Sequence, residues 1–439
     1  MRHKRQILFM LVLSVALLSV QTVLAQDEPI TLTYWETFGS QDGGVQAQII
    51  AEFEASHPNV QIVQEFVPFE EMSVKLPPAL QSGTGPDIIY ADVAPQFLGS
   101  YVQAGHILPL SDAAEQFGWD ERVFDWAQRR ATYDGELFAI GHEMEVLTLM
   151  YNQKIFDELG LEVPTTLEEL ETTMAAIRDQ SDYVPMMLAT GPGPWNGFHM
   201  MHALAYAMMD VSQVANTTPQ GDGSYADPNW LQVFEKYQEW VNAGYFPAEA
   251  NSIDWEGHWS LFCAGQVAML AQGTWLFLPL SECEAENPEL FDFSVAPFPS
   301  AEGRPYQSYV GIGSAWYLNA ALEEDPARKQ AALEFLDALI SPENAVRWVQ
   351  EAQLFPAVPF DASSVELTEQ QQAALAIVEQ AGAEGGGPVP VGFNNSPEEL
   401  EVWRNVVQGL VAGSLTPEQA AEMLNEALVA AQEAWAAAE

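Results

Sequence analysis

The apolar residues of the first hundred positions follow two different periods along the chain. Segments 30–35, 60–66 and 87–90 are short and rich in apolar and β-branched residues, as strands are. Between the first two, Val45, Ile49 and Phe53 recur at helical spacing after a Gly-Gly turn. This alternation predicts an α/β fold in which a mostly parallel sheet is flanked by helices.

Ligands of such sheets bind beyond the carboxyl ends of the strands. Segments 35–41 and 92–95 follow the first and third predicted strands, so they are expected at the mouth of a binding site. Residues 72–81 predict a helix between the second and third strands. The pair Pro77-Pro78 inside it predicts a break or a kink, because proline cannot donate the backbone hydrogen bond.

Residues 133–170 carry the clearest local signals. Asp134-Gly135 is a turn dipeptide, segments 137–140 and 146–151 predict strands, and 153–159 predicts a helix. Gly160 stands where a left-handed helix cap is usual, and Thr166 with Glu169 forms a capping box. Residues 164–291 are mainly helical, 294–297 and 309–318 resemble strands, and the C-terminal third is helical. Three of its helix starts place a capping hydroxyl before proline, at Ser341, Ser396 and Thr416.

The same stretch carries a string that periodicity does not explain. It resembles a segment of the extracellular solute-binding proteins of ABC importers, the maltose-binding-protein-like family. The residues that carry the resemblance are Tyr151-Asn152-Gln153-Lys154, Phe156, Gly160-Leu161 and Pro164-Thr165. Further segments of that family are resembled, in the same order, by residues 262–275, 295–303 with 309–318, and 331–356. Phe138 and Gly141 depart from the family's usual Tyr and Pro.

The resemblance implies a two-lobed periplasmic-binding-protein fold of type II, each lobe a mostly parallel sheet flanked by helices, with a ligand cleft between the lobes. It implies an N-terminal lobe of residues 26–139 plus 299–355 and a C-terminal lobe of 140–298 plus 356–439. It also implies a function: a monomeric substrate-binding component that captures a sugar or oligosaccharide and delivers it to membrane permease subunits, without catalysis.

Residues 1–25 are predicted to be a signal peptide rather than structure. A basic start precedes an apolar run at 7–20, and small residues end at Ala25, where cleavage is expected. An uncleaved anchor is the alternative. The protein is therefore expected to be periplasmic or extracellular. Its formal net charge of −47 disfavours nucleic acid and anionic membranes as partners.

The two cysteines, Cys263 and Cys283, are a possible disulfide. Both lie in the exported part of the chain, where disulfides persist. Two buried thiols are the alternative, because the sequence does not show whether the residues approach each other.

Motifs of catalysis and of metal binding are incomplete. The segment 142–146 begins like a zinc-protease motif but lacks its second histidine, and no phosphate-binding loop is present. His199 and His202 are interpreted as satisfied helix histidines rather than metal ligands. No cofactor, no metal and no enzymatic activity are therefore expected. Carboxylates such as Glu143 and Glu145 still leave a glycoside-active enzyme open, and a binder of an amine, a peptide or a phosphodiester is a further alternative.

Several tryptophans lie in segments rich in polar residues and glycine. A sugar stacks its apolar face on such a ring while carboxylates and amides bind its hydroxyls. The alternative for each ring is a place in the core. The predicted ligand-binding residues follow predicted strands or lie in such loops: Trp35, Glu36, Gln41, Asp92, Glu143, Glu145, Trp195, Trp255, Gln272 and Trp275.

Overall fold

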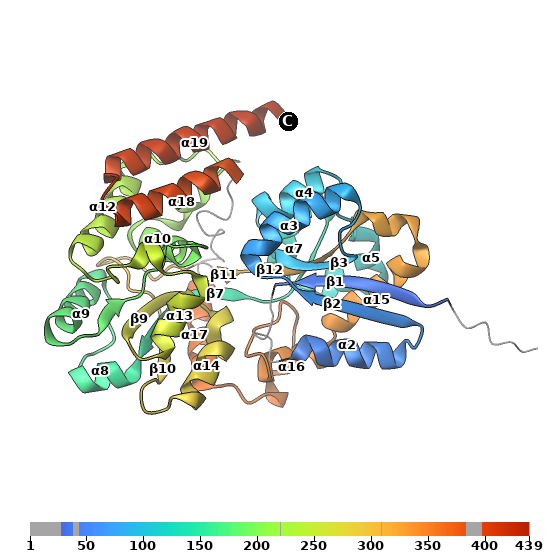
Figure 1. Cartoon of the computed structure of the whole chain (residues 1–439), viewed down its shortest axis with the longest axis horizontal. Coiled ribbons are helices and arrows are strands. Elements are labelled where there is room, and N and C mark those ends of the chain that lie inside the picture. Colours follow the sequence, from blue (N-terminus) through green and yellow to red (C-terminus); the bar gives the residue numbers. More distant parts are fainter. Residues whose placement is uncertain (1–27, 38–43, 220, 309, 383–396, 439) are drawn as a thin grey trace, which may run out of the picture.

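The computed structural model describes residues 28–37, 44–219, 221–308, 310–382 and 397–438. Gln41, Ser396 and the predicted signal peptide lie outside these ranges. The described chain forms two halves, each built around its own sheet with helices on the outside (Figure 1). The first half carries the N-terminal elements, drawn in blue, and the second half carries the elements drawn in green and yellow.

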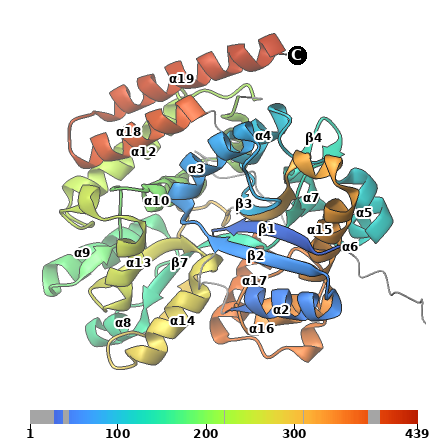
Figure 2. The ribbon, with the colours of Figure 1, turned by 45° about the vertical axis from the view of Figure 1, so that its right-hand side comes forward.

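The first sheet has the strand order β2-β1-β3-β12-β6. Its strands are β1 (Ile30–Glu36), β2 (Val60–Phe66), β3 (Ile88–Asp92), β6 (Ile140–Gly141) and β12 (Ser314–Leu318). β1 runs parallel to both β2 and β3, which brings Glu36 opposite Tyr90. β3 is buried along its whole length at the centre of the sheet. In Figure 2, α2 (Val45–Ser56) lies beside β2, and it also packs on α15 (Pro326–Leu339) and α16 (Pro342–Gln350).

The second sheet has the strand order β10-β7-β9-β8, and β11 pairs with the start of β7. Its strands are β7 (Glu145–Asn152), β8 (Val184–Met186), β9 (Val267–Gly273), β10 (Phe293–Ala296) and β11 (Val310–Gly311). β9 is buried at every position, and β7 at every position after Glu145. These two central strands therefore carry the core of the second half.

The prediction of an α/β chain with two separate sheets is confirmed, but the prediction that each sheet is mostly parallel is wrong. β12 runs antiparallel to β3 and to β6. In the second sheet only β8 and β9 are parallel. A strand buried on both faces shows an apolar run whichever way its neighbours point, so the hydrophobic pattern does not report strand direction.

Three segments connect the two halves side by side. Residues 142–144 lead from β6 to β7, and Ile312-Gly313 lead from β11 to β12. Residues 355–357 are the third: Met144 N donates to Phe355 O at 2.6 Å, and Ala357 N donates to His142 O at 2.7 Å. These contacts show which segments link the two sheets. They do not fix the exact lobe boundaries, and the boundaries at 139/140, 298/299 and 355/356 stay a prediction.

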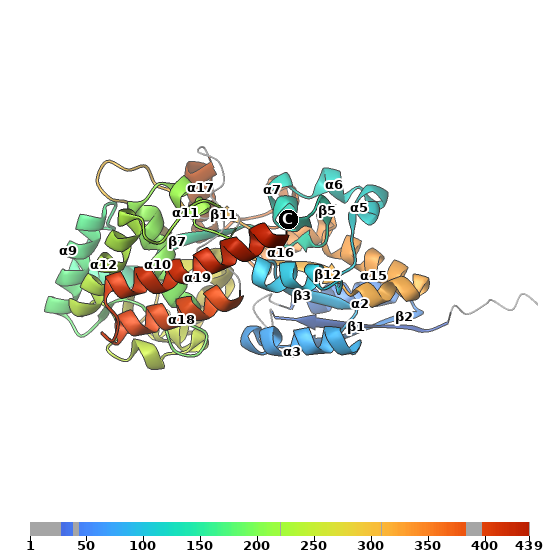
Figure 3. The ribbon, with the colours of Figure 1, turned by 90° about the horizontal axis from the view of Figure 1, so that it is seen from above.

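Helices cover both halves. α18 (Pro397–Val411) and α19 (Pro417–Ala438) lie side by side along the second half, where both pack on α12 (Pro228–Asn242) (Figure 3). α17 (Glu369–Gly382) packs on β10 and β7. The other helices are α3 (Phe69–Ser82), α4 (Ser100–Gln103), α5 (Ser111–Phe117), α6 (Trp119–Arg122), α7 (Asp125–Arg130), α8 (Gln153–Leu159), α9 (Leu167–Gln180), α10 (Trp195–Met208), α11 (Val211–Asn216), α13 (Trp255–Cys263) and α14 (Phe277–Glu286). No described helix is long and apolar enough to cross a membrane.

Most local signals have the predicted consequence. Asp134 and Gly135 both have positive φ, 50° and 82°, in the turn between β4 (Thr132–Tyr133) and β5 (Glu136–Leu137). Gly160 caps α8 with φ 64°, and the capping box of Thr166 and Glu169 opens α9. Of the break or kink expected at Pro77-Pro78, the break is wrong, because α3 continues through both residues to Ser82; the kink stays a prediction.

The two cysteines belong to neighbouring helices of the second half. Cys263 ends α13, Cys283 lies in α14, and the structure pairs them in a disulfide with Cα atoms 5.6 Å apart. The bond ties the two helices that flank β9 and the segment after it.

Candidate functional site

The first sheet presents three of the predicted residues at the carboxyl ends of parallel strands. Glu36 ends β1 and Asp92 ends β3, and both are buried. Trp35 points to the opposite face from Glu36 and is half-buried; Lys75 Nζ of α3 lies 4.4 Å from its ring centroid. The strand order therefore brings Glu36 and Asp92 to one edge, as expected.

Three predicted carboxyl groups gather at the links between the halves. Asp92 comes from β3, Glu143 from the segment after β6, and Glu145 from the first position of β7. Glu143 is 2% exposed, and its Oε2 atom has no hydrogen-bond partner among the described residues. Asp92 accepts a hydrogen bond from Ala94 N at 2.5 Å. The structure thus brings the three carboxyl groups close enough for their charges to interact, and their contact with a ligand stays a prediction.

Burial makes these groups hold their protons more tightly than in water. It raises the pKa of Asp92 to about 6, although the positive charge of Arg130 acts in the opposite direction. Burial also raises the pKa of Glu143. The pKa of Glu145 is raised well above its ordinary value, first by burial and then by the negative charges of Glu143 and Asp92.

Arg130 is the cation of this cluster, and sequence reasoning missed it. It ends α7, donates to the Ile312 carbonyl, and its charge lowers the pKa of both Asp92 and Glu145. The chain has only 15 lysines and arginines, so each basic residue was a candidate for such a role. Nothing local in the segment around Arg130 indicated that it would face the ends of distant strands.

A second cluster lies in the second half, around three histidines. The ring of His199 lies 5.1 Å from Trp275 and 6.0 Å from Trp255, measured between centroids. Gln272 Nε2 lies 2.9 Å from His258 Nε2, and Gln272 is fully buried. Trp255 and Trp275 are half-buried. The structure thus brings together three of the predicted residues, from α13, β9 and the turn after β9.

The histidines of this cluster are neutral at pH 7. Burial lowers the pKa of His199 to about 3 and that of His258 to about 4. Burial and the charge of His199 lower the pKa of His202 well below its ordinary value. Among the described residues no group of His, Cys, Asp or Glu side chains is arranged to hold a metal ion.

Trp195 stands apart from Trp255 and Trp275 because it bridges the two halves. Its ring lies 5.1 Å from Phe69 of α3 and 6.5 Å from Phe97, both in the first half. From its own half, the Arg404 guanidinium carbon lies 5.2 Å from the ring. Trp195 is 4% exposed. The residue predicted as a stacking surface is thus enclosed by neighbouring side chains.

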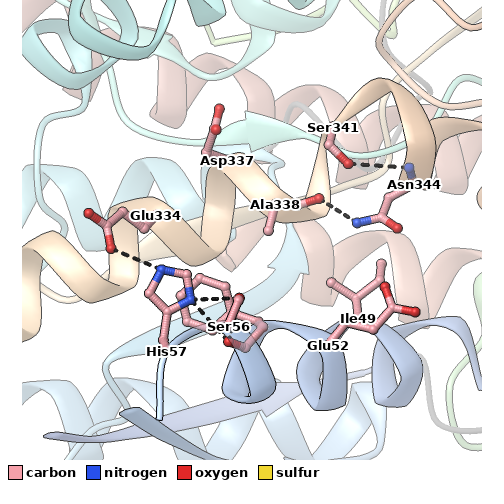
Figure 4. Close-up of a pocket in the computed structure, with 10 residues that line it drawn as sticks. Ile49, Glu52, Ser56, His57, Glu334, Asp337, Ala338, Ser341 and Asn344 are labelled. Carbon is pink, nitrogen blue, oxygen red and sulfur yellow. Dashed lines mark hydrogen bonds and ion pairs between the residues drawn. The ribbon is translucent and has the colours of Figure 1, made fainter. Parts of the chain in front are cut away.

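A pocket of about 360 Å³ lies elsewhere, between α2, α15 and α16 (Figure 4). His57 Nε2 lies 3.6 Å from Glu334 Oε2 within it, beside Asp337, Ser341 and Asn344. None of the predicted ligand-binding residues lines this pocket. It therefore belongs to the outer helices of the first half and not to the candidate site.

The chain resembles known binding proteins over most of its length. A chitin oligosaccharide binding protein of known structure matches with a TM-score of 0.82 at 20% identity, covering 92% of this chain and 99% of that one, which shows the shared two-lobed fold. An uncharacterized ABC transporter extracellular-binding protein of Pyrococcus horikoshii is 22% identical over 254 residues, or 57% of this chain and 58% of the relative. An arabinooligosaccharide-binding protein of Halalkalibacterium halodurans is 29% identical over 146 residues, 32% of this chain and 31% of the relative.

A family match covers most of the chain, from α2 to α17. Residues 48–376 match the family described as bacterial extracellular solute-binding protein, whose members bind substrates rather than convert them. This range includes the three segments that link the halves, the carboxyl cluster beside them and the tryptophan cluster of the second half. The two-lobed fold and the match together show that the chain belongs to the bacterial extracellular solute-binding protein family.

Proposed function

We propose that this protein captures a carbohydrate, most simply an oligosaccharide, between its two lobes and delivers it to the transmembrane subunits of an ABC importer. The observation that carries the proposal is the pair of half-buried rings, Trp255 and Trp275, beside neutral polar side chains. Aromatic rings stack on the apolar faces of sugars, and neutral imidazole and amide groups can donate to or accept from hydroxyls.

The carboxyl cluster supplies the polar counterpart on the other side of the proposed cleft. Asp92 comes from the first sheet and Glu145 from the second, so a solute that contacts both would tie the lobes together. In this proposal Trp35, Glu36 and Gln41 belong to the first lobe's side of the site, while Gln272 acts through His258, to which it is bonded. The names of the relatives, which include chitin and arabinose oligosaccharides, support a carbohydrate.

The family match argues against a glycoside-active enzyme. Such an enzyme needs a protonated acid and an ionised partner. Burial raises the pKa of Asp92 to about 6 and that of Glu143 to about 8, so the chain has carboxyl groups of both kinds. Residues 48–376, however, match a family of solute-binding proteins, and we therefore propose binding without turnover.

The same carboxyl groups favour one second candidate, a solute that carries an amine. Among the described residues, Arg130 is the one cation whose charge acts on the pKa of Asp92 and Glu145, and a cationic ligand would relieve the mutual repulsion of the acidic groups. A phosphodiester, which is negatively charged, would be repelled by these acidic groups.

A thermal-shift screen separates these candidates. The panel contains maltotriose, xylotriose and chitotriose, the amines putrescine and spermidine, a tripeptide and glycerophosphodiesters. A ligand present at a hundred times its dissociation constant stabilises the folded state by about 2.7 kcal/mol, which raises Tm by several degrees. We expect a neutral oligosaccharide to raise Tm and to be recovered intact after overnight incubation. A rise with an amine or a peptide alone would overturn the carbohydrate proposal, and sugar cleavage would overturn the binding-only role.

A further inference from the structure

Two glycines lie directly beneath side chains of the proposed site. A Cβ atom added to Gly313 would stand 1.9 Å from Glu145 Oε1 and 2.3 Å from Glu145 Cδ. A Cβ atom added to Gly273 would stand 1.9 Å from Cζ3 and 2.2 Å from Cη2 of the Trp275 ring. Non-bonded carbon atoms prefer separations of roughly 3.5–4.0 Å, so neither side chain could keep its place above an alanine.

Backbone conformation does not explain these two glycines. Gly273 has φ −96° and ψ 169°, an extended conformation that any residue adopts. Gly313 is not among the described glycines with positive φ, in contrast to Gly160 with φ 64°. What the two positions require is therefore the absence of a side chain.

Gly313 lies in the segment that passes from the second sheet to the first. Its carbonyl accepts a hydrogen bond from Val93 N at 3.1 Å, and the neighbouring Ile312 carbonyl accepts from Arg130. Two hydrogen bonds, from Val93 and from Arg130, thus hold the backbone of this segment. The Glu145 carboxylate, in contrast, is the end of a flexible side chain. An alanine here would turn that carboxylate away and leave the backbone where it is.

Gly273 ends β9, two residues before Trp275, and lets the indole ring fold back over its own strand. Trp275 is half-buried, and its Nε1 atom is buried without a hydrogen-bond partner among the described residues. No hydrogen bond of that nitrogen fixes the ring, so packing sets its position: it lies over Gly273, beside His199 and against buried apolar side chains.

We propose that Gly273 and Gly313 are positioning residues of the solute site: each provides a side-chain-free backbone surface on which a ligand-contacting side chain, Trp275 or Glu145, is held in place. The proposal rests on the proposed function only in the assignment of Trp275 and Glu145 to the ligand. The positions of the two side chains can be measured without any ligand, so the two proposals can fail separately.

The first experiment follows Trp275 by ¹⁹F NMR in protein labelled with 5-fluorotryptophan. Its signal among the 13 tryptophans is assigned by its loss in Trp275→Phe. We expect Gly273→Ala to shift this signal while the signals of buried tryptophans of the first half, such as Trp119, stay in place. The matched control is Gly160→Ala. Gly160 is needed for its positive φ, and an added Cβ atom would meet open space there. This variant should lower Tm without moving the Trp275 signal. An unshifted Trp275 signal in folded Gly273→Ala would overturn the proposal for this residue.

The second experiment compares crystal structures of the parent and of Gly313→Ala. We expect the Glu145 carboxylate to move by more than 1 Å while the backbone of residues 310–314 superimposes. Movement of that backbone with an unmoved carboxylate would show that Gly313 serves chain packing instead.

A third experiment measures whether Gly273 affects the binding of a solute. With maltotriose, xylotriose and chitotriose as probes, Gly273→Ala should weaken binding by on the order of tenfold or more, as loss of an aromatic anchor does. In a Trp275→Ala background, Gly273→Ala should have no further effect. If the parent binds none of these sugars while the ¹⁹F signal still moves, the proposed function fails and the positioning role stands. If a sugar binds Gly273→Ala as it binds the parent, the positioning role fails.

Discussion

At the scale of single residues, the candidate site divides into an apolar and an acidic part. The half-buried rings of Trp255 and Trp275 belong to the second half, and the carboxyl groups of Asp92, Glu143 and Glu145 stand at the links between the halves. Each part can be tested by changing one side chain, because the neighbours of each are known.

We expect Trp255→Ala and Trp275→Ala each to weaken oligosaccharide binding by about 2 kcal/mol or more, near thirtyfold, because a buried aromatic anchor contributes more than a rim contact. Gln41→Ala should cost only about 0.5–1.5 kcal/mol, the loss of one hydrogen bond. Titration calorimetry on folded variants measures the ranking. Trp435→Ala is the control, because that ring is 45% exposed on α19. Parent-like binding by both tryptophan variants would place these rings outside the site.

The raised pKa of Glu143 has a consequence for stability. A carboxyl that holds its proton more tightly when folded stabilises the folded state fully below its unfolded pKa of about 4.3, and this contribution is lost as pH rises through the folded pKa. Glu143→Gln should therefore gain stability relative to the parent between pH 5 and pH 8, by about 1 kcal/mol or more. Urea unfolding at both pH values measures the difference. A difference independent of pH would mean that Glu143 ionises as it does in water.

At the scale of elements, the disulfide between α13 and α14 is the clearest constraint. It closes a loop with a sequence separation of 20 residues, which is worth roughly 3 kcal/mol in the chain-entropy model. We expect no alkylated cysteine in intact mass spectra recorded without reductant, and a lower Tm for the Cys263→Ser/Cys283→Ser variant. Reductant should lower the Tm of the parent but not that of the variant. Two labelled thiols in the native protein would contradict the pairing.

At the scale of the whole molecule, the two halves touch through aromatic side chains as well as through the links. Phe69 of α3 and Phe97 contact Trp195 of α10 across the halves. This contact requires the halves to be close together, so a rotation that separates the halves would break it. Extended links can absorb the rotation of rigid lobes, as in hinge closure around a ligand.

A saturating oligosaccharide should therefore reduce the radius of gyration in small-angle X-ray scattering. Phe69→Ala should lessen this reduction, because it removes the edge-to-face contact with Trp195 across the halves, whereas Phe124→Ala should not, since Phe124 stacks on Trp126 within the first half. Identical scattering with and without the sugar would contradict lobe closure.

The sequence by itself determined the features that depend on near neighbours in the chain. The turn at Asp134-Gly135, the cap at Gly160 and the capping box at Thr166 all form as predicted, because each depends on the φ preferences and hydrogen bonds of a few adjacent residues. The positions of Glu36 and Asp92 at one edge followed from the parallel order of β1 and β3. The family string around Tyr151-Asn152 carried the two-lobed fold.

Tertiary structure alone decided what depends on segments distant in the chain. No local signal predicted the antiparallel direction of β12, because an apolar run does not indicate strand direction. The place of Arg130 and the unbroken α3 likewise depend on distant segments, because a basic residue in the sequence does not indicate its partners. The same holds for Trp195, which is enclosed by side chains from both halves. Glu145 above Gly313 is the plainest case: neither residue indicates the other, and only the pairing of β11 with β7 brings the carboxylate to the bare backbone.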